Sequence, residues 1–315
     1  MLPVVIIGGG PAGMSCALWL SNFGIPAIII ESAPMLGGLQ CRSHVSNKWV
    51  LGAQAVTGAQ LAQQFAKHIR YERIQHLLNS EIIEIMGSIG GFKVSFKTHD
   101  QVGMILCSNV VIAAGTEPCG HSWFKSVNGA DLAKKFVRIG TAQYTDPEEW
   151  FGCSPVIIGG GDSAVECAIF LAARGMRAKL IARSSLHASK TMLTKILELT
   201  STGVVQIFER TVVTAIKEGP RNARVILSNG EKLDASTIFI MFGYKPRSAD
   251  ISKYQALNNL SLGVDSIINI DDSCQSSIPG VYAIGDIANG KDRCVAMAIA
   301  MGSVAARRIN YFHSK

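Results

Sequence analysis

The sequence predicts an α/β fold in which one strand–turn–helix–strand unit occurs twice. The segment VVIIGGGPAG at 4–13 reappears as PVIIGGGDSA at 155–164, and each copy is a β-branched run followed by three glycines and a helical pattern. Each helical pattern closes on a glycine, at Gly24 and at Gly175, where a left-handed cap is expected. Second strands follow at 26–31 and at 178–183. Both segments are therefore predicted βαβ units.

The remaining predicted elements fit around these two units. Residues 57–70 form an amphipathic helical pattern whose expected N-cap is Thr57. Helical periodicity returns at 293–312. Alternating apolar patterns predict strands at 81–86, 92–97, 103–114, 211–217, 224–227 and 235–242.

Two short polar passages with Pro and Gly, TEPCG at 116–120 and GYKPRS at 243–248, separate strand-like runs. They predict paired crossings into and out of an inserted domain that holds the second βαβ unit. Ordinary loops inside one domain are the alternative. The predicted domains are a split first domain, residues 1–117 and 246–315, and an inserted second domain, residues 118–245.

Composition narrows the class of protein. The 315 residues are 48% apolar and 17% charged, which is typical of a globular chain with a packed core rather than a disordered one. No apolar run reaches the roughly 18 residues of a membrane span, and no basic stretch precedes the first apolar run. The net charge of +7 is spread along the chain instead of being clustered. We expect a soluble, cytoplasmic protein without a membrane or nucleic-acid partner.

The eight cysteines, at 16, 41, 107, 119, 153, 167, 274 and 294, form no CxxC. This excludes the usual zinc spacing and the usual dithiol redox motif. The seven histidines show no ligand spacing either, so no metal is predicted. Buried free thiols are expected at most of these positions.

The first glycine motif is Gly8-x-Gly10-x-x-Gly13, after a strand and at the start of a helix. In such a motif the first glycine permits the tight turn, the second lets the backbone approach a pyrophosphate, and the third lets helix and strand pack closely. Glu31 follows at the end of the next strand, where a carboxylate accepts hydrogen bonds from a ribose diol. The motif predicts a dinucleotide site, and an ordinary glycine-rich turn is the alternative.

The second motif, Gly159-x-Gly161-x-x-Ala164, follows the same logic with Ala in the close-packing position. Its second strand ends at Arg183, where an acidic residue would select a free 2′-hydroxyl. A cation there suits a 2′-phosphate, which favours NADPH over NADH. A solvated surface arginine is the alternative.

A third element is Gly285-Asp286, just before the C-terminal helix, which we expect to start near Asp292. The Asp286 carboxylate is placed to bond polyol hydroxyls. The positive end of the following helix would stabilise the negative charge of a reduced flavin.

Together these motifs resemble the low-molecular-weight thioredoxin reductase family of FAD-dependent pyridine-nucleotide oxidoreductases, over essentially the whole length. The similar segments are GGGPAG at 8–13, Glu31, GGLQ at 37–40, IAAGT at 112–116, GGGDSAVE at 159–166, FGYKP at 242–246 and IPGVYAIGDIAN at 278–289. The resemblance implies two Rossmann-like domains of three-layer ββα build, with the NAD(P)H domain inserted into the FAD domain, and a homodimer.

The resemblance also implies two sets of cofactor-binding residues. Those for FAD are Gly8, Gly10, Pro11, Ala12, Gly13, Glu31, Gly38, Leu39, Gln40, Ile82, Ala114, Gly115, Gly285, Asp286, Arg293, Cys294 and Val295. Those for NADPH are Gly159, Gly161, Asp162, Ser163, Ala164, Glu166, Arg183 and Gly243.

The sequence departs from the family at its redox centre. The two cysteines of the family's CxxC would fall on Ala142 and Thr145, counting back from Gly159. The family's basic pair for the 2′-phosphate is reduced to Arg183, and its Arg-Gln pair reads Arg293-Cys294. A related branch, the thioredoxin-reductase-like ferredoxin–NADP reductases, also lacks the CxxC and has a stretch resembling YTDPEEWFG.

Three functional hypotheses follow. In the leading one, NADPH reduces FAD and electrons pass directly to ferredoxin, flavodoxin, a quinone or another small acceptor. In the second, the chain reduces disulfides through Cys41, or through a cysteine pair assembled in space. Cys294 is a further candidate thiol, and Cys41 lacks the CxxxxC partner because position 46 is serine. In the third, the chain is a redox-silent flavin- or nucleotide-binding sensor.

Overall fold

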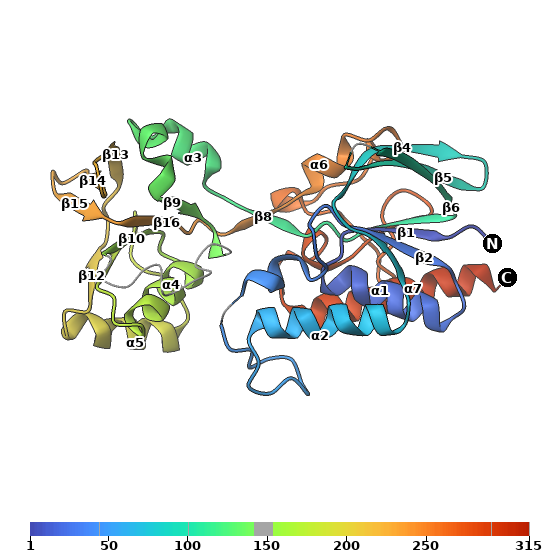
Figure 1. Ribbon diagram of the computed structural model, residues 1–315, viewed down its shortest axis with the longest axis horizontal. Helices are drawn as coiled ribbons and strands as arrows, with labels where there is room; N and C mark the ends of the chain where they lie inside the picture. The colour runs from blue at the N-terminus through green and yellow to red at the C-terminus, as the bar shows by residue number, and fades with distance from the viewer. Residues whose placement is uncertain (44, 100, 142–153, 291, 315) are drawn as a thin grey trace. The chain divides into compact units, whose positions relative to one another are not determined.

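The computed structural model describes residues 1–43, 45–99, 101–141, 154–290 and 292–314 (Figure 1). The chain forms two compact units. The first comprises Met1–Glu117 together with Lys245–Lys315, and the second comprises Pro118–Tyr244. The second unit is thus inserted into the first.

The first unit is built on a five-stranded parallel sheet of order β18-β7-β1-β2-β3. In its centre, Val4 of β1 lies opposite both Ala27 of β2 and Asn109 of β7. The strands are β1 (Val4–Ile7), β2 (Ala27–Ile30), β3 (Gln75–Leu77), β7 (Asn109–Ile112) and β18 (Val281–Ala283).

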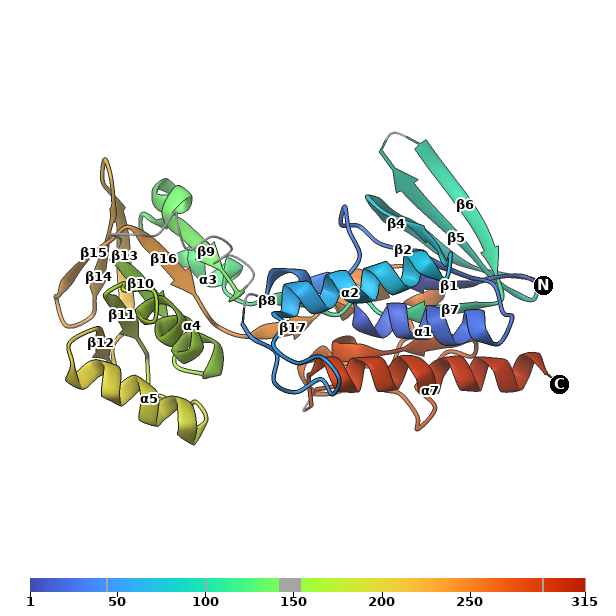
Figure 2. The same cartoon turned by 60° about the horizontal axis from the view of Figure 1, so that its bottom comes forward.

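This sheet is the middle of three layers (Figure 2). Alternate residues of β1 point to opposite faces, so Val4 and Ile6 pack with the helices, whereas Val5 and Ile7 pack with a second sheet. The helices are α1 (Pro11–Asn22), α2 (Gly58–Tyr71) and α7 (Val295–His313). The second sheet is antiparallel and comprises β4 (Ser80–Ser88), β5 (Gly91–Thr98) and β6 (Gln101–Cys107).

The second unit repeats this build. Its parallel sheet has the order β12-β11-β10-β16-β9, with Ile157 facing the helices and Val156 and Ile158 facing an antiparallel sheet. The parallel strands are β9 (Val137–Ile139), β10 (Pro155–Ile158), β11 (Ala178–Ile181), β12 (Val205–Phe208) and β16 (Thr237–Ile240). The other elements are α3 (His121–Ser126), α4 (Asp162–Ala172), α5 (Lys190–Ser201), β13 (Val213–Glu218), β14 (Ala223–Leu227) and β15 (Lys232–Ala235). The predicted α/β class, with two three-layer Rossmann-type domains, is confirmed.

The helix ends follow the local sequence signals. Gly10 is the N-cap of α1 and Pro11 its first residue, where the missing proline N–H costs no hydrogen bond. Thr57 caps α2 in a capping box with Gln60, as its sequence position predicts. Gly24 and Gly175 follow α1 and α4 with φ of 73° and 80°, which confirms the predicted left-handed caps.

The single strand predicted at 103–114 is wrong. The chain there divides at Ser108 into β6 and β7, which belong to different sheets. Both halves contribute to one core, through Ile105 and Cys107 of β6 and Val110 and Ile112 of β7, and the outward residues of β6 are apolar as well. The apolar run therefore continues on both sides of Ser108, and periodicity does not reveal the break. The last helix begins at Val295, three residues after the expected start.

The two predicted crossings pair with each other. Strand β8 (Thr116–Pro118) and strand β17 (Tyr244–Pro246) form a two-stranded sheet, and a short helix, α6 (Ser248–Ser252), follows. Near their ends, the Cys119 amide donates to the Gly243 carbonyl at 2.9 Å. None of the helices in the described part of the chain combines the length and apolar character that a transmembrane span needs.

Candidate cofactor sites

The first glycine turn has the geometry that a dinucleotide loop needs. A side chain at Gly8, whose φ is 111°, would collide with the carbonyl oxygen of Ala113. One at Gly13 would collide with the carbonyl of Gly8, so α1 can approach β1 only with glycine there. Around Gly10, by contrast, no heavy atom of the described residues other than Gly10 and its two chain neighbours lies within 4 Å of the position of an added Cβ. The turn therefore leaves open space at the N-terminus of α1, where phosphate groups bind.

Glu31 is buried at the end of β2 and holds the turn in shape. One carboxylate oxygen accepts the Gly9 amide at 2.7 Å, and the other accepts the Ala33 amide at 2.8 Å. Each oxygen keeps further acceptor capacity, so the carboxylate can still receive hydrogen bonds from a ribose diol. Glu31 is thus fixed beside the glycine turn by two backbone amides.

The GGLQ segment folds back onto the glycine turn. The Gly37 amide donates to the Gly9 carbonyl at 2.8 Å, and a Cβ on Gly38 would lie 3.1 Å from the Cα of Gly10. Both glycines have positive φ, 127° and 58°. The short 3₁₀ helix Gly38–Arg42 carries the next two predicted residues, Leu39 and Gln40, beside the turn.

The Gly285-Asp286 segment lies against the start of α1. A Cβ on Gly285 would stand 2.9 Å from the Cβ of Ala12. Burial raises the pKa of Asp286, and the Arg293 guanidinium opposes this rise. A carboxylate that is already partly desolvated gains from hydroxyl donors, so Asp286 suits the polyol of a flavin nucleotide.

The start of α7 completes this region. Cys294 is the N-cap of the helix, and its Sγ accepts the Met297 amide at 3.4 Å. Val295 is the first residue of the helix, nine residues after Asp286 in the chain, so the N-terminal end of α7 belongs to the same C-terminal segment as the Gly285-Asp286 turn. The Cys294 thiol therefore has a structural partner in addition to any redox role.

Most of the predicted FAD residues gather at one edge of the parallel sheet. The glycine turn, Glu31, Ala114 with Gly115, and Asp286 follow the carboxyl ends of β1, β2, β7 and β18, which is where nucleotides bind in open α/β sheets. Ile82 lies elsewhere, on β4 of the antiparallel sheet, and its carbonyl accepts the Tyr254 hydroxyl at 2.8 Å. The open space at Gly10 and the acceptors at Glu31 and Asp286 fit FAD.

Cys41 lies in the same region, but its surroundings do not activate it. Its thiol donates to the Leu36 carbonyl at 3.2 Å. Burial raises the thiol pKa, Glu31 raises it further, and Arg42 only partly offsets these effects. Because the thiolate is the nucleophile, a raised pKa makes Cys41 a weak one.

Two buried thiols also have raised pKa values. Burial raises the pKa of Cys107 to about 12 and that of Cys274 to about 11. The positions of the family's dithiol, Ala142 and Thr145, lie outside the described residues, and so does Cys153.

The second glycine turn, in the inserted unit, has a comparable geometry. A side chain at Gly159 would collide with the Met241 carbonyl, and its Cβ would stand 3.0 Å from that of Ala164. Asp162 and Ser163 begin α4, and the Asp162 carboxylate accepts the Ser189 amide at 2.8 Å. Burial, aided by Asp162, raises the pKa of Glu166. Gly243 follows β16 with a φ of 78°.

The loop after β11 crosses this turn. Arg183 is exposed at its start, which agrees with both a 2′-phosphate ligand and a solvated surface arginine. Sequence analysis missed His187, whose amide donates to the Gly160 carbonyl at 2.9 Å and whose ring stands beside Gly160 and Gly161. No spacing signal marks this histidine, because the return of the loop onto the turn is a tertiary feature.

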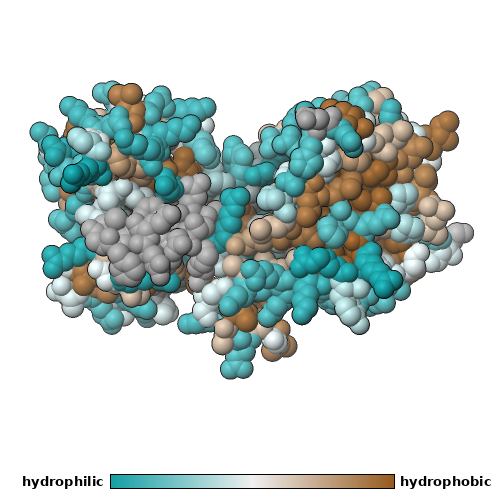
Figure 3. Space-filling view, viewed as in Figure 1, coloured by the Kyte–Doolittle hydropathy of each residue, from teal (hydrophilic) through white to brown (hydrophobic). Residues whose placement is uncertain are grey.

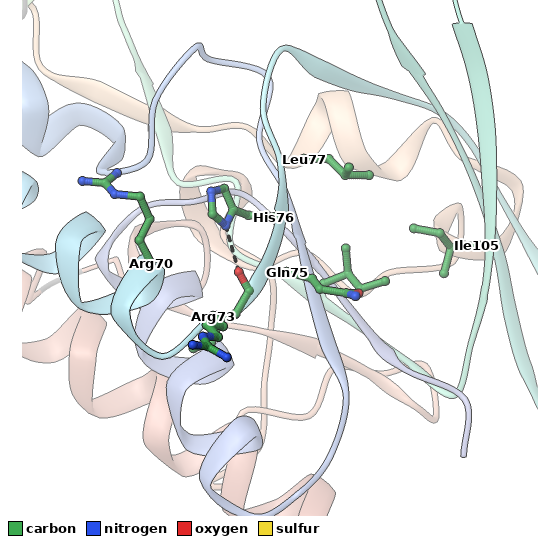
Figure 4. Close-up of a pocket in the computed structure, with 8 residues that line it drawn as sticks. Arg70, Arg73, Gln75, His76, Leu77 and Ile105 are labelled. Atoms are coloured by element: carbon green, nitrogen blue, oxygen red, sulfur yellow. Dashed lines mark hydrogen bonds between the residues drawn. The ribbon is translucent and has the colours of Figure 1, made fainter.

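A separate hollow of about 570 Å³ opens at the β3 edge of the first unit. Figure 4 shows its lining on both sides of β3, with Arg70, Arg73 and His76 on one side and Gln75, Leu77 and Ile105 on the other. Apolar side chains gather over this unit in Figure 3, and Val102, Met104 and Leu106 of β6 are exposed. None of the residues that line the hollow belongs to the predicted cofactor sites.

Over the described ranges, no three His, Cys, Asp or Glu side chains cluster as a metal site.

Comparison with known proteins places this geometry in a family. The chain is 28% identical to a ferredoxin–NADP reductase of Granulibacter bethesdensis, over 98% of this chain and 88% of that one. It is 25% identical to a thioredoxin reductase of Mycolicibacterium smegmatis, over 96% and 94%. The solved T. acidophilum thioredoxin reductase superposes with a TM-score of 0.82 at 23% identity, over 100% and 99% of the two chains.

The family model for pyridine nucleotide-disulphide oxidoreductases matches residues 2–302. That span includes both glycine turns, Glu31 and Asp286. FAD and NADPH are the cofactors that this family membership and the ferredoxin–NADP reductase relative indicate. The chain belongs to the pyridine nucleotide-disulphide oxidoreductase family and is a thioredoxin-reductase-like flavoenzyme.

Proposed function

We propose that this chain is an NADPH-dependent flavin oxidoreductase that passes electrons from FAD directly to an acceptor, without a dithiol relay. The observation that carries the proposal is the thiol chemistry. The sequence contains no CxxC. Of the two cysteines that the structure places in the flavin region, Cys41 is hydrogen-bonded and has a raised pKa, and the Sγ of Cys294 caps α7. Disulfide reduction by the usual route needs an attacking thiolate and a second, resolving thiol.

The first unit, residues 1–117 and 246–315, is proposed to bind FAD. When bound, FAD accepts a hydride from NADPH and delivers electrons to the acceptor. The α1 N-terminus would bind the pyrophosphate, Glu31 the ribose diol and Asp286 the ribityl hydroxyls. Glu31 is already oriented by two backbone amides, so little ordering is needed when the cofactor binds.

The second unit, residues 118–245, is proposed to bind NADPH. The α4 N-terminus would bind the pyrophosphate of the nucleotide, and Arg183 the 2′-phosphate. Asp162 holds the loop that carries Arg183 through its bond to the Ser189 amide. This arrangement supports NADPH over NADH as the physiological reductant.

Several acceptors agree with this chemistry. Relatives are named both ferredoxin–NADP reductase and thioredoxin reductase, so the names alone do not choose between them. A direct route favours ferredoxin, flavodoxin, a quinone or another small acceptor. A homodimer in the cytoplasm is part of the same proposal, and nucleic acid and membrane are not among its partners.

Anaerobic titration of the purified protein tests the function. NADPH should bleach the flavin absorbance. Ferricyanide, a quinone or oxidised ferredoxin, each of which accepts electrons from reduced flavin, should restore it. Flavin that NADPH cannot bleach would favour the redox-silent sensor instead. A colourless protein that does not take up FAD would refute the whole proposal.

Cys41→Ser separates the direct route from the single-thiol route. A direct-transfer enzyme should keep nearly all its ferricyanide turnover and show negligible thioredoxin reduction before and after the change. Cys119→Ser is the matched control, since that thiol is also partly buried but lies outside the flavin region. Robust thioredoxin turnover that is lost only in Cys41→Ser would establish the disulfide route.

A further inference from the structure

The loop after β11 is held in a defined position over the second glycine turn. Three backbone amides of this loop are bonded to neighbouring elements. The His187 amide donates to the Gly160 carbonyl at 2.9 Å, and the Ser189 amide to Asp162 on α4 at 2.8 Å. The Leu186 amide donates to Glu209, which follows β12, at 2.7 Å. The side chain of His187 is therefore attached to a fixed backbone.

The nitrogen-bearing edge of the His187 ring faces the turn. Its Nε2 lies 3.3 Å from the position of a Cβ on Gly161, and its Nδ1 lies 3.5 Å from that of a Cβ on Gly160. The ring is also exposed to solvent. An exposed donor group at the side of a glycine-rich turn is in reach of a phosphate bound there.

We propose that the imidazole of His187 is a second contact for the pyrophosphate of the bound nucleotide, and that protonation of this ring strengthens nucleotide binding. The inference rests on the proposed NADPH site. In this arrangement the two residues of the loop contact different groups. Arg183 would bind the 2′-phosphate, which only NADPH carries, and His187 would contact the pyrophosphate, which NADPH and NADH share.

The link to protonation follows from the hydrogen bonds of the ring. Nδ1 lies 3.5 Å from the Ser185 carbonyl, which can only accept, so the proton in this contact is on Nδ1. A neutral ring with that proton presents an acceptor at Nε2. To donate from Nε2 to a phosphate the ring must carry both protons and thus a positive charge.

Other charged groups lie on this loop and on the elements next to it, and their effect on nucleotide binding has to be distinguished from that of His187. They are Asp162 and Glu166 on α4, Glu209 after β12, Lys190 at the start of α5 and Arg183 on the same loop. Asp162 and Glu209 already accept backbone amides. Glu166, whose pKa is raised by burial, is the group whose titration most needs a control.

Calorimetric titration of the flavin-loaded protein with NAD⁺ at pH 6 and pH 8 tests the proposal. NAD⁺ is the cleaner probe, because the 2′-phosphate of NADP⁺ itself titrates near pH 6, as phosphate monoesters do. The wild type should bind NAD⁺ about two- to fivefold more tightly at pH 6, the range of an exposed charge pair. His187→Gln should bind with the weaker constant at both pH values. His121→Gln, which removes an exposed histidine of the same unit, should behave as wild type.

Two further variants, Arg183→Ala and Glu166→Gln, distinguish the role of His187 from those of the other charged groups. His187→Gln should weaken NADP⁺ and NAD⁺ by the same factor, whereas Arg183→Ala should weaken NADP⁺ alone. Wild-type binding whose pH dependence survives in His187→Gln, or disappears in Glu166→Gln, would overturn the inference and leave the NADPH site intact. Wild type that binds neither nucleotide would overturn the NADPH site and this inference together.

Discussion

Removal of the Glu31 carboxylate should damage both the fold of the glycine turn and the binding of FAD. In the structure this carboxylate accepts the buried Gly9 amide at 2.7 Å and the Ala33 amide at 2.8 Å. A hydrogen bond to a charged acceptor contributes about 1.5–3 kcal/mol, and a buried donor left without a partner costs about 1–3 kcal/mol. The Ala33 amide is only partly buried and can turn to water. We therefore expect Glu31→Ala to lower the free energy of unfolding of the apoprotein by about 2–4 kcal/mol.

The loss of FAD affinity should come in addition. Lost hydrogen bonds to the ribose diol are worth about 1–3 kcal/mol, which corresponds to roughly 5- to 150-fold weaker binding. Urea unfolding followed by tryptophan fluorescence measures the first effect, and quenching of free FAD fluorescence measures the second. In both measurements Glu31→Gln should fall between wild type and Glu31→Ala, because its amide oxygen still accepts one of the two backbone amides.

The exposed carboxylate of Glu84, on β4 of the same unit, provides the matched control. Glu84→Ala should change neither the unfolding free energy nor FAD affinity by more than about 0.5 kcal/mol. If Glu31→Ala were as stable as wild type and bound FAD equally well, the carboxylate would be neither the anchor of the turn nor a ribose ligand.

Three further predictions follow from the packing and charge of the sites. Gly302→Ala should lower the free energy of unfolding in urea by about 1–3 kcal/mol, because its Cβ would stand 2.6 Å from the Ala12 carbonyl oxygen and force α7 away from α1. Val304→Ala, at an exposed position of the same helix, is the control and should be near neutral. Burial raises the folded-state pKa of Asp286, so its contribution to apoprotein stability is lost as the pH rises through that pKa. Asp286→Asn should therefore unfold at a higher temperature than wild type at pH 8 and lose that advantage at low pH. The same variant should bind FAD more weakly. Arg183→Ala should reduce the NADPH-to-NADH preference in flavin reduction about two- to tenfold, and an unchanged preference would make Arg183 a plain surface residue.

The sequence by itself determined the elements whose signals are local. Three glycines after a β-branched run specify a strand, a tight turn and a helix start, because only glycine tolerates the backbone of Gly8 and Gly159. Thr57 and Gln60 mark the start of α2 because their hydrogen bonds lie within one helical turn. The class of fold, the family and the two nucleotide motifs all followed from such signals.

Short and partly buried elements escaped prediction. Strands β3, β9 and β12 have three or four residues each, which is too few for an alternating pattern to stand out. They are strands because a neighbouring strand of the parallel sheet supplies their hydrogen bonds. The break at Ser108 escaped for a related reason, since the sequence on both sides is apolar and only the assignment to two sheets separates β6 from β7.

Only the tertiary structure decided how distant segments complete each site. Gly38 reaches Gly10, Gly285 reaches Ala12, and the His187 ring reaches Gly161, although from 26 to 273 residues separate the members of these pairs along the chain. The same holds for Cys41, which sequence position alone leaves as a candidate nucleophile. Its burial and its bond to the Leu36 carbonyl make the thiol a poor one, because desolvation and a nearby carboxylate both disfavour the thiolate.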